Sequence, residues 1–283
     1  MKGNSNEFKY SKSERIWRII FTAVLAIYCC FTVYMIILTI SNSFKTREDL
    51  IVNTFGFAKT FSLESYKFVL EDGYARSFLN SVIVTGASVI GTIVLGVTTA
   101  YGITRYKFKY SDAILSYFIM GMMLPIQLKL IPLYSLLKSM HLMNSFLGVI
   151  LINISNLSLP VFILATFFKT LPHELYEAGK MDGASEFKVF YHIMVPLGKP
   201  IIATVALLTT FSVWNDFFLP LVVLSSKTKF TLPLMINNYT SALLQNWNYL
   251  FAAVTLSIIP IILIFVLFSK QIIEGIASGG VKG

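Results

Sequence analysis

The side chains that most often do chemistry in proteins are few here, and they are scattered along the chain. His141, His173 and His192 include no pair with the spacing of metal ligands on one helical face. Cys29 and Cys30 are adjacent within an apolar run, which favours small buried apolar residues over a redox or metal pair. No G-x-x-x-x-G-K-[ST] phosphate-binding loop occurs. We therefore expect no catalysis, no metal and no cofactor in this chain, although an intramembrane enzyme stays open.

The elements that must position the remaining polar groups are predominantly apolar. Of the 283 residues, 55% are hydrophobic and 13% are charged, whereas soluble domains have about 25% charged residues. Because lipid offers the backbone no hydrogen-bond partner, uninterrupted apolar runs of about 20 residues must be membrane-spanning helices. Six runs reach this length, over residues 19–40, 81–104, 113–134, 146–168, 201–224 and 249–269. The predicted fold is all-α and polytopic, with six transmembrane helices.

The distribution of basic residues predicts the orientation of these helices. A net charge of +9 could indicate a nucleic-acid partner in a soluble protein. Here the basic residues gather in "YSKSERIWR" before the first run and in "RYKFK" after the second, as the positive-inside rule requires of cytoplasmic segments. We therefore expect a lipid bilayer and no nucleic acid as partner, with both termini in the cytoplasm. The external segment 41–79 is expected to form short interfacial helices.

Ionisable side chains are almost absent from the six runs. The second, fourth and sixth runs contain none, the third contains only Lys129 and the fifth only Asp216. Proton- or sodium-coupled carriers usually place such groups near the bilayer midplane. Any uphill transport is therefore expected to take its energy from outside the membrane segments of this chain. Pro125, Pro160 and Pro260 are expected to kink the third, fourth and sixth helices.

A hydrophilic segment, residues 171–200, interrupts the apolar runs. "HELYEAGKM" is rich in helix formers, Asp182 and Gly183 predict a turn, and Ser185 is a candidate N-cap for "EFKVFYHIM". The second of these short helices carries an apolar face of its own. A helical hairpin this small must dock on something. It is either an amphipathic connector on the membrane surface or a docking element for a partner.

The spacing within this segment resembles the cytoplasmic signature of ATP-binding-cassette (ABC) importer permeases, written E-A-A, three residues, G, nine residues, I-x-L-P. The matching residues are Glu177, Ala178, Gly183, Ile193 and Pro196. Gly179 replaces the second alanine and Val195 the leucine. Gly179 is expected to weaken its helix by up to about 1 kcal/mol relative to alanine.

The resemblance extends over nearly the whole chain. "NSVIVTGASV", "RYKF", "MLPIQLKLIPLY", "WNDFFLPLVVL" and the ending "GIASGGVKG" occur in the order found in the MalG-like subfamily, which serves carbohydrates. The resemblance implies a non-catalytic subunit of type I ABC importer permease architecture in the cell membrane of a prokaryote. Residues 1–79 would form the tail, first helix and external loop, and residues 80–283 the transmembrane domain.

The partners follow from the same resemblance. They are a second, MalF-like permease, two copies of a cytoplasmic ATPase that bind ATP and Mg²⁺, and an extracytoplasmic substrate-binding protein. The segment 171–200 would seat in the ATPase. The residues expected to couple it there are Glu177, Ala178, Gly179, Asp182, Gly183, Ala184, Ser185, Ile193 and Pro196.

The expected solute is a carbohydrate, such as an oligosaccharide, and the sequence does not name the sugar. Candidate pathway residues combine hydrogen-bonding side chains with an aromatic face, and they are Asn153, Ser155, Asn156, Ser158, Trp214, Asn215 and Asp216. Asn153 and Asn156 share a helical face at i, i+3. Polar packing between helices is the alternative role for this set, and Asp216 could instead fix the outer end of its helix. A self-sufficient secondary carrier or channel for a small polar solute is the competing function.

Overall fold

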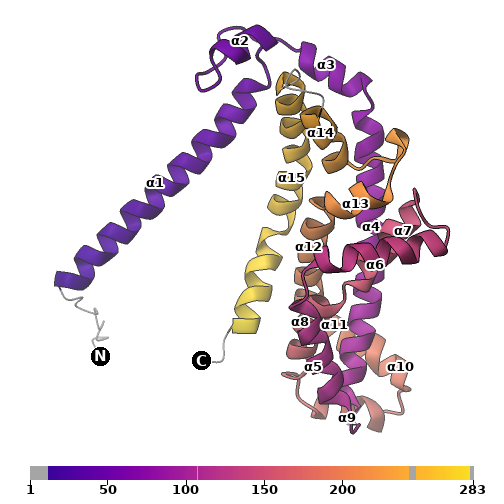
Figure 1. Cartoon of the computed structure of the whole chain (residues 1–283). Coiled ribbons are helices and arrows are strands. Elements are labelled where there is room, and N and C mark those ends of the chain that lie inside the picture. The colour runs from indigo at the N-terminus through magenta and orange to yellow at the C-terminus, as the bar shows by residue number, and fades with distance from the viewer. Residues whose placement is uncertain (1–11, 107, 242–246, 281–283) are drawn as a thin grey trace.

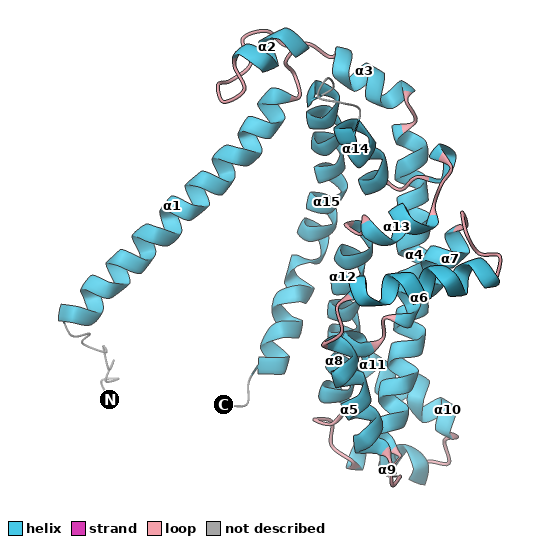
Figure 2. Cartoon of the chain, viewed as in Figure 1, coloured by secondary structure: helices cyan, strands magenta, loops and turns pink. Residues whose placement is uncertain are grey.

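The computed structural model describes residues 12–106, 108–241 and 247–280. All regular elements in these ranges are helical (Figure 2), which confirms the all-α prediction. The molecule is elongated, and α1 (Lys12–Asn42) extends away from the other helices (Figure 1). The segment 41–79, which the sequence predicts to be external, contains α2 (Arg47–Val52) and α3 (Glu64–Glu71) at one end of the molecule, and short helices were expected there.

Three helices are each long and apolar enough to cross a membrane. They are α1, α4 (Tyr74–Arg105) and the first part of α15 (Trp247–Gly280). Two bent helix pairs pass the same test together, which gives up to five spans by length and composition among the described residues. The structure thus agrees with a polytopic membrane protein, and the predicted number of six spans is not confirmed.

The predicted third span is not one helix. The structure divides it into α5 (Ser111–Met122) and α6 (Ile126–Ser139), and Pro125 between them has an extended backbone with ψ 142°. Proline lacks a backbone N–H and disfavours helical geometry in the residue before it. The expectation of a single kinked helix over residues 113–134 is therefore wrong, because the chain breaks completely at this proline.

The fourth predicted span is also broken, into α7 (Phe146–Ser155) and α8 (Ser158–Phe168), which meet at 42°. The break begins at Asn156, four residues before Pro160, where the proline ring would clash with the helical carbonyl. The fifth span follows the same rule: α12 (Lys199–Trp214) and α13 (Phe218–Val223) are separated just ahead of Pro220. Pro260 leaves α15 continuous.

The helix α4 is the centre of the bundle, packed against α7, α8, α12 and α14 (Leu232–Ser241). Its glycines allow this. An added Cβ at Gly91 would lie 2.3 Å from Ile154 Cδ1 of α7, and one at Gly96 would lie 3.3 Å from Leu164 Cδ1 of α8. Small residues on one face let apolar helices approach closely in lipid. The C-terminal end of α4 contacts the hydrophilic segment 171–200, where Arg105 and Tyr106 form hydrogen bonds with His173 and Glu186.

The remaining short elements lie in that segment and in the loop between α13 and α14. They are α9 (Glu174–Met181), α10 (Glu186–Val189), the π-helical turn η1 (Phe190–Met194), α11 (Val195–Leu197) and the 3₁₀ turn η2 (Lys227–Lys229). In Figure 1, α9 and α10 lie at the end of the molecule opposite α2 and α3.

Candidate functional site

The structure contains two candidate functional sites, a helical hairpin at one end and a polar cavity in the bundle. The hairpin is formed by α9 and by α10 with η1 and α11. Gly183 adopts a left-handed φ of +76° in the turn, a conformation that favours glycine. Ser185 accepts a hydrogen bond from the backbone N–H of Lys188 (3.3 Å) and caps α10. The predicted turn and N-cap are thus confirmed.

Close packing explains the glycine at position 179, and the sequence alone did not predict this. Gly179 is buried, and an added Cβ would lie 2.7 Å from Ile193 Cδ1 and 3.2 Å from Val189 Cγ2. The backbone of α9 therefore touches the second half of the hairpin directly. Its carbonyl also accepts a hydrogen bond from the N–H of Ala184 (3.1 Å). Replacing alanine by glycine in the signature brings the two halves closer together.

A single carboxylate ties the hairpin to the end of α4. Tyr176 donates its hydroxyl to Glu186 Oε1 (2.7 Å), and Tyr106 donates to Glu186 Oε2 (3.0 Å). Lys180 Nζ lies 3.1 Å from the same carboxylate. The hydrogen bond from Tyr176 is the main reason that the pKa of Glu186 lies below its usual value. Glu186 therefore stays ionised and joins three segments of the chain.

Arg105, the last residue of α4, adds a second link. Its guanidinium carbon lies 4.0 Å from the centre of the Tyr176 ring, and one of its N–H groups donates to the carbonyl of His173 (3.0 Å). Sequence reasoning assigned no role to Arg105, Tyr106 or Glu186. Glu186 lies 80 residues after Tyr106, which is adjacent to Arg105, so no local spacing reveals these contacts.

The hairpin turns part of its apolar surface outward. Met181, Phe187 and Tyr191 are 88%, 73% and 58% exposed, and the last two stack with ring centres 6.2 Å apart. We call these three residues the exposed apolar set. Phe190 and Met194 instead pack into the core around α4 and α8. The structure thus divides the predicted apolar face of the second helix into a buried half and an exposed half.

The other expected coupling residues lie around this set. Glu177, Ala178 and Asp182 are exposed on α9 and in the turn, Pro196 is exposed on α11, and Ile193 is half-buried against Gly179. Within the described residues no group of three or more His, Cys, Asp or Glu side chains is placed to hold a metal ion. The hairpin therefore presents exposed apolar side chains next to exposed polar ones.

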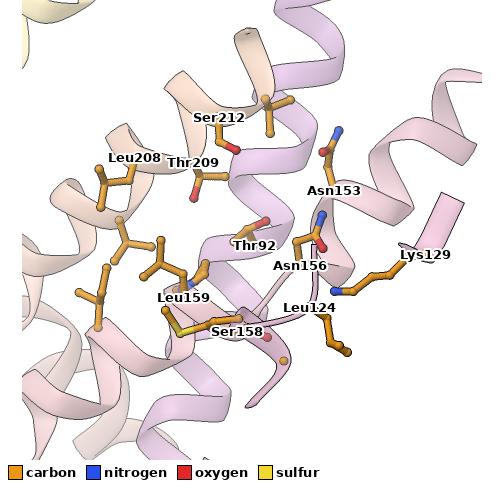
Figure 3. A pocket seen from close by; sticks show the side chains of 16 residues that line it. Thr92, Leu124, Lys129, Asn153, Asn156, Ser158, Leu159, Leu208, Thr209 and Ser212 are labelled. Atoms are coloured by element: carbon orange, nitrogen blue, oxygen red, sulfur yellow. The ribbon is translucent and has the colours of Figure 1, made fainter. Parts of the chain in front are cut away.

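The second place is a partly open cavity of about 430 Å³ lined by residues of α4, α5, α6, α7, α8 and α12. Figure 3 shows side chains from these helices converging on it. Its polar lining comprises Thr92, Lys129, Asn153, Asn156, Ser158, Thr209 and Ser212, and the rest of the wall is mainly aliphatic. Hydrogen-bonding groups spaced along apolar walls suit a small hydroxylated solute.

Two of these polar groups are buried and lack a partner. The Asn153 Nδ2 and Thr92 Oγ1 atoms form no hydrogen bond within the described residues, and both atoms are inaccessible to solvent. Leaving such a group unpaired costs about 1–3 kcal/mol. Polar packing between helices has not satisfied them, so they keep a hydrogen-bonding capacity that a movement of the cavity wall would expose to an incoming molecule.

The predicted pathway residues separate into two sets. Asn153, Asn156 and Ser158 meet at the cavity, while Ser155 points its hydroxyl back to the carbonyl of Ile152 (2.7 Å). Thr92, Thr209 and Ser212 also line the cavity, and sequence reasoning missed them because single hydroxyls in apolar helices carry no distinctive pattern.

The second set lies elsewhere. Trp214 packs edge-on against Phe78, with ring centres 5.8 Å apart, and Asn215 Nδ2 donates to the carbonyl of its neighbour Phe211 (2.9 Å). Trp214 and Asn215 line a separate groove of about 410 Å³ between α12, α14 and α15. Asp216 Oδ1 accepts the backbone N–H of Leu219 (3.3 Å) at the start of α13.

A polytopic helical bundle that combines a polar cavity with an exposed helical hairpin is typical of a membrane transport subunit. The family model described as "Binding-protein-dependent transport system inner membrane component" matches residues 92–277 of this chain. The chain belongs to that family. The matched residues include both the cavity and the hairpin, so the family relationship covers the two candidate sites.

Individual relatives of this chain are also transport proteins. The chain is 31% identical to the probable ABC transporter permease protein YurM of Bacillus subtilis (strain 168), over 97% of this chain and 90% of that protein. It is also 31% identical to the arabinooligosaccharides transport system permease protein AraQ of the same organism, over 97% of this chain and 99% of that protein. A crystal structure of a bacterial ABC transporter involved in the import of the acidic polysaccharide alginate contains a chain of the same fold. Its TM-score is 0.82 at 22% identity, with 92% of this chain and 98% of that chain covered.

Proposed function

We propose that this chain forms half of the transmembrane pathway for a carbohydrate in an ATP-driven importer and is driven through its hairpin by a cytoplasmic ATPase. The main support for this proposal is the structure of the hairpin. Its polar side chains bind one another, while its exposed apolar set faces outward. A carbohydrate is supported by relatives whose names specify arabinooligosaccharides and, at 29% identity, diacetylchitobiose from Streptomyces coelicolor.

The hairpin is joined to the walls of the cavity on both sides. The helix α8 leads into it and α12 leads out of it, and each contributes to the cavity, with Ser158 from α8 and Thr209 from α12. The second half of the hairpin meets α12 at 75°. Because the Glu186 and Arg105 contacts hold the hairpin as one unit, a push on it by a closing ATPase would reach both walls as a rigid-body motion.

The proposed assembly follows from this coupling. The chain pairs with a MalF-like permease, two copies of the ATPase bind ATP and Mg²⁺ beneath the hairpin, and an extracytoplasmic binding protein delivers the solute. This chain itself hydrolyses nothing. Both termini would lie in the cytoplasm of a prokaryotic cell, a placement supported by Figure 1, where the first residues of α1 and the last of α15 point toward the end that carries α9.

Reconstitution tests the proposal. The complex is purified with its co-purifying permease and ATPase, placed in proteoliposomes and assayed for ATP-dependent uptake of labelled oligosaccharides. The variant Gly183→Pro is expected to abolish uptake, because proline cannot adopt φ +76°. Gly183→Asn is the matched control, since asparagine tolerates the left-handed region. Solute flux through this chain alone, without ATPase, would instead identify a secondary carrier or channel.

A further inference from the structure

Among the residues that line the cavity, one carries a charge. Lys129 lies in α6 just after the chain break at Pro125, is half-buried, and extends toward Asn156 (Figure 3). The cavity lining contains no aspartate or glutamate. Within the described part of the chain Lys129 also forms no ion pair. The cavity therefore holds a cation without a counter-charge.

A charged side chain inside a membrane protein is unusual, and its position has to be explained. A lysine among apolar helices is costly, and it is usually retained where it faces a pathway or an anion. Long lysine side chains near helix ends can extend to the membrane surface instead. Here the ammonium group lies among the polar side chains that line the cavity, beside the amide of Asn156. It is directed into the candidate pathway.

The neighbouring groups define what could bind beside this charge. Asn153, Asn156, Ser158 and Thr92 offer amides and hydroxyls, and the free Asn153 Nδ2 and Thr92 Oγ1 atoms lack partners within the described residues. These groups match the hydroxyls of a sugar. The ammonium group of Lys129 matches a carboxylate or phosphate, the partners that lysine binds most strongly.

We infer that the solute is an anionic carbohydrate whose carboxylate or phosphate is bound by Lys129 while its hydroxyls are bound by Asn153, Asn156 and Thr92. A neutral sugar in the same position would leave the ammonium group uncompensated, so the cavity discriminates against it. The inference rests on the proposed transport function and adds the charge of the substrate to it.

The test uses the complete importer in proteoliposomes and two matched pairs of solutes. One pair is trigalacturonate and galactotriose, and the other is glucose 6-phosphate and glucose, so the two pairs distinguish a carboxylate from a phosphate. The wild type is expected to prefer the anionic member of one pair. The variant Lys129→Gln is expected to lower that preference about 10- to 100-fold, the range for a lost hydrogen bond to a charged group, while Lys129→Arg retains most of it.

Lys138→Gln is the matched control, because it removes the same charge from the same helix at an exposed position outside the cavity. Its preference is expected to equal that of the wild type. Preferred uptake of a neutral member, or an unchanged ratio in Lys129→Gln, would overturn the inference and leave the transport function intact. If an intact, ATP-hydrolysing complex takes up labelled neutral oligosaccharides but none of the anionic solutes, the inference is overturned and the transport function stands. If it takes up no labelled oligosaccharide of any charge, the transport proposal fails and the inference fails with it.

Discussion

The hairpin and the cavity differ in which side chains have partners and which are left exposed or unpaired. In the hairpin, Glu186 binds Tyr106, Tyr176 and Lys180, while large apolar side chains such as Phe187 are exposed. In the cavity, the wall is mainly apolar, and two buried polar atoms, Asn153 Nδ2 and Thr92 Oγ1, have no partner within the described residues. A surface that exposes apolar atoms on a rigid frame suits a protein partner, whereas a cavity that leaves polar atoms free suits a hydrophilic solute.

The contrast also separates the two kinds of damage that a substitution can cause. A change in the hairpin should affect the coupling between ATP hydrolysis and uptake without altering which solute is preferred. A change in the cavity should affect the solute while the ATPase still binds. Variants in the two regions can test that separation, and the largest loss of uptake is expected in the hairpin.

The largest effect is expected from Phe187→Glu in the exposed apolar set. The carboxylate would be buried against the ATPase without a partner, which costs several kcal/mol. ATP-dependent uptake should fall more than about 100-fold by the same argument, and the ATPase should no longer co-purify. Pull-down of the ATPase with the tagged permease measures this directly.

Phe187→Leu is the control, because it keeps an apolar side chain at the same position. It should retain the ATPase and most of the uptake. Wild-type amounts of co-purified ATPase with Phe187→Glu would show that this part of the hairpin does not face the ATPase.

A smaller effect is expected from Glu186→Ala, which removes the acceptor of both tyrosine hydroxyls. Because the Glu186 side chain is 44% exposed, its interactions are screened, and we expect about a 5-fold loss of uptake. The measured quantity is the uptake per ATP hydrolysed. A loss of uptake with unchanged solute preference would support the assignment to coupling, whereas an altered preference would contradict it.

The same residue gives a pH dependence with a defined sign. Its hydrogen bond from Tyr176 lowers the pKa of Glu186 in the folded protein. Its contribution to stability is therefore fully present above the pKa of the unfolded chain and is lost as the pH falls through the lowered value. Thermal unfolding scans of the wild type and Glu186→Gln should differ at neutral pH and converge in acid.

In the cavity, Thr92→Val should separate stability from function. The change replaces an unpartnered buried hydroxyl by a methyl group of similar shape, so the melting temperature should stay the same or rise. The KM for uptake should rise about 5-fold, the value of one neutral hydrogen bond to the solute.

Thr98→Val in the same helix is the control for this variant. Its hydroxyl bonds the carbonyl of Val94 (2.8 Å) and is exposed away from the cavity, so the KM should not change. A lower melting temperature for Thr92→Val would mean that its hydroxyl serves the fold instead of the solute.

The hairpin was the part most open to prediction from sequence. Its turn glycine, its serine cap and its signature spacing are local features, and local features depend on a few neighbouring residues. The contacts that hold the hairpin in place, such as Tyr106 to Glu186, join residues far apart in sequence, and nothing in the local pattern specifies them.

Only some of the residues that line the cavity could be predicted from the sequence. Asn153, Asn156 and Ser158 could be selected because amides and hydroxyls are unusual in an apolar run. Whether such a residue faces a cavity depends on where the helices break. The break at Asn156 brings residues 153, 156 and 158 to one wall, and packing of Trp214 on Phe78 turns that residue away from it.

The smallest effect is expected at Gly179, where two physical terms oppose each other. Gly179→Ala should strengthen α9 by up to about 1 kcal/mol through helix propensity. The new Cβ would also press on Ile193 Cδ1 at 2.7 Å and on Val189 Cγ2 at 3.2 Å, so the net change in stability should stay within about 1 kcal/mol. Adding Ile193→Val removes the nearer methyl group. The double variant should therefore be more stable than the sum of the two single changes predicts, and a double-mutant cycle of melting temperatures measures that difference. Strict additivity would mean that the two halves of the hairpin do not touch at this position, and the rigid-body coupling would then have to rest on Glu186 and Arg105 alone.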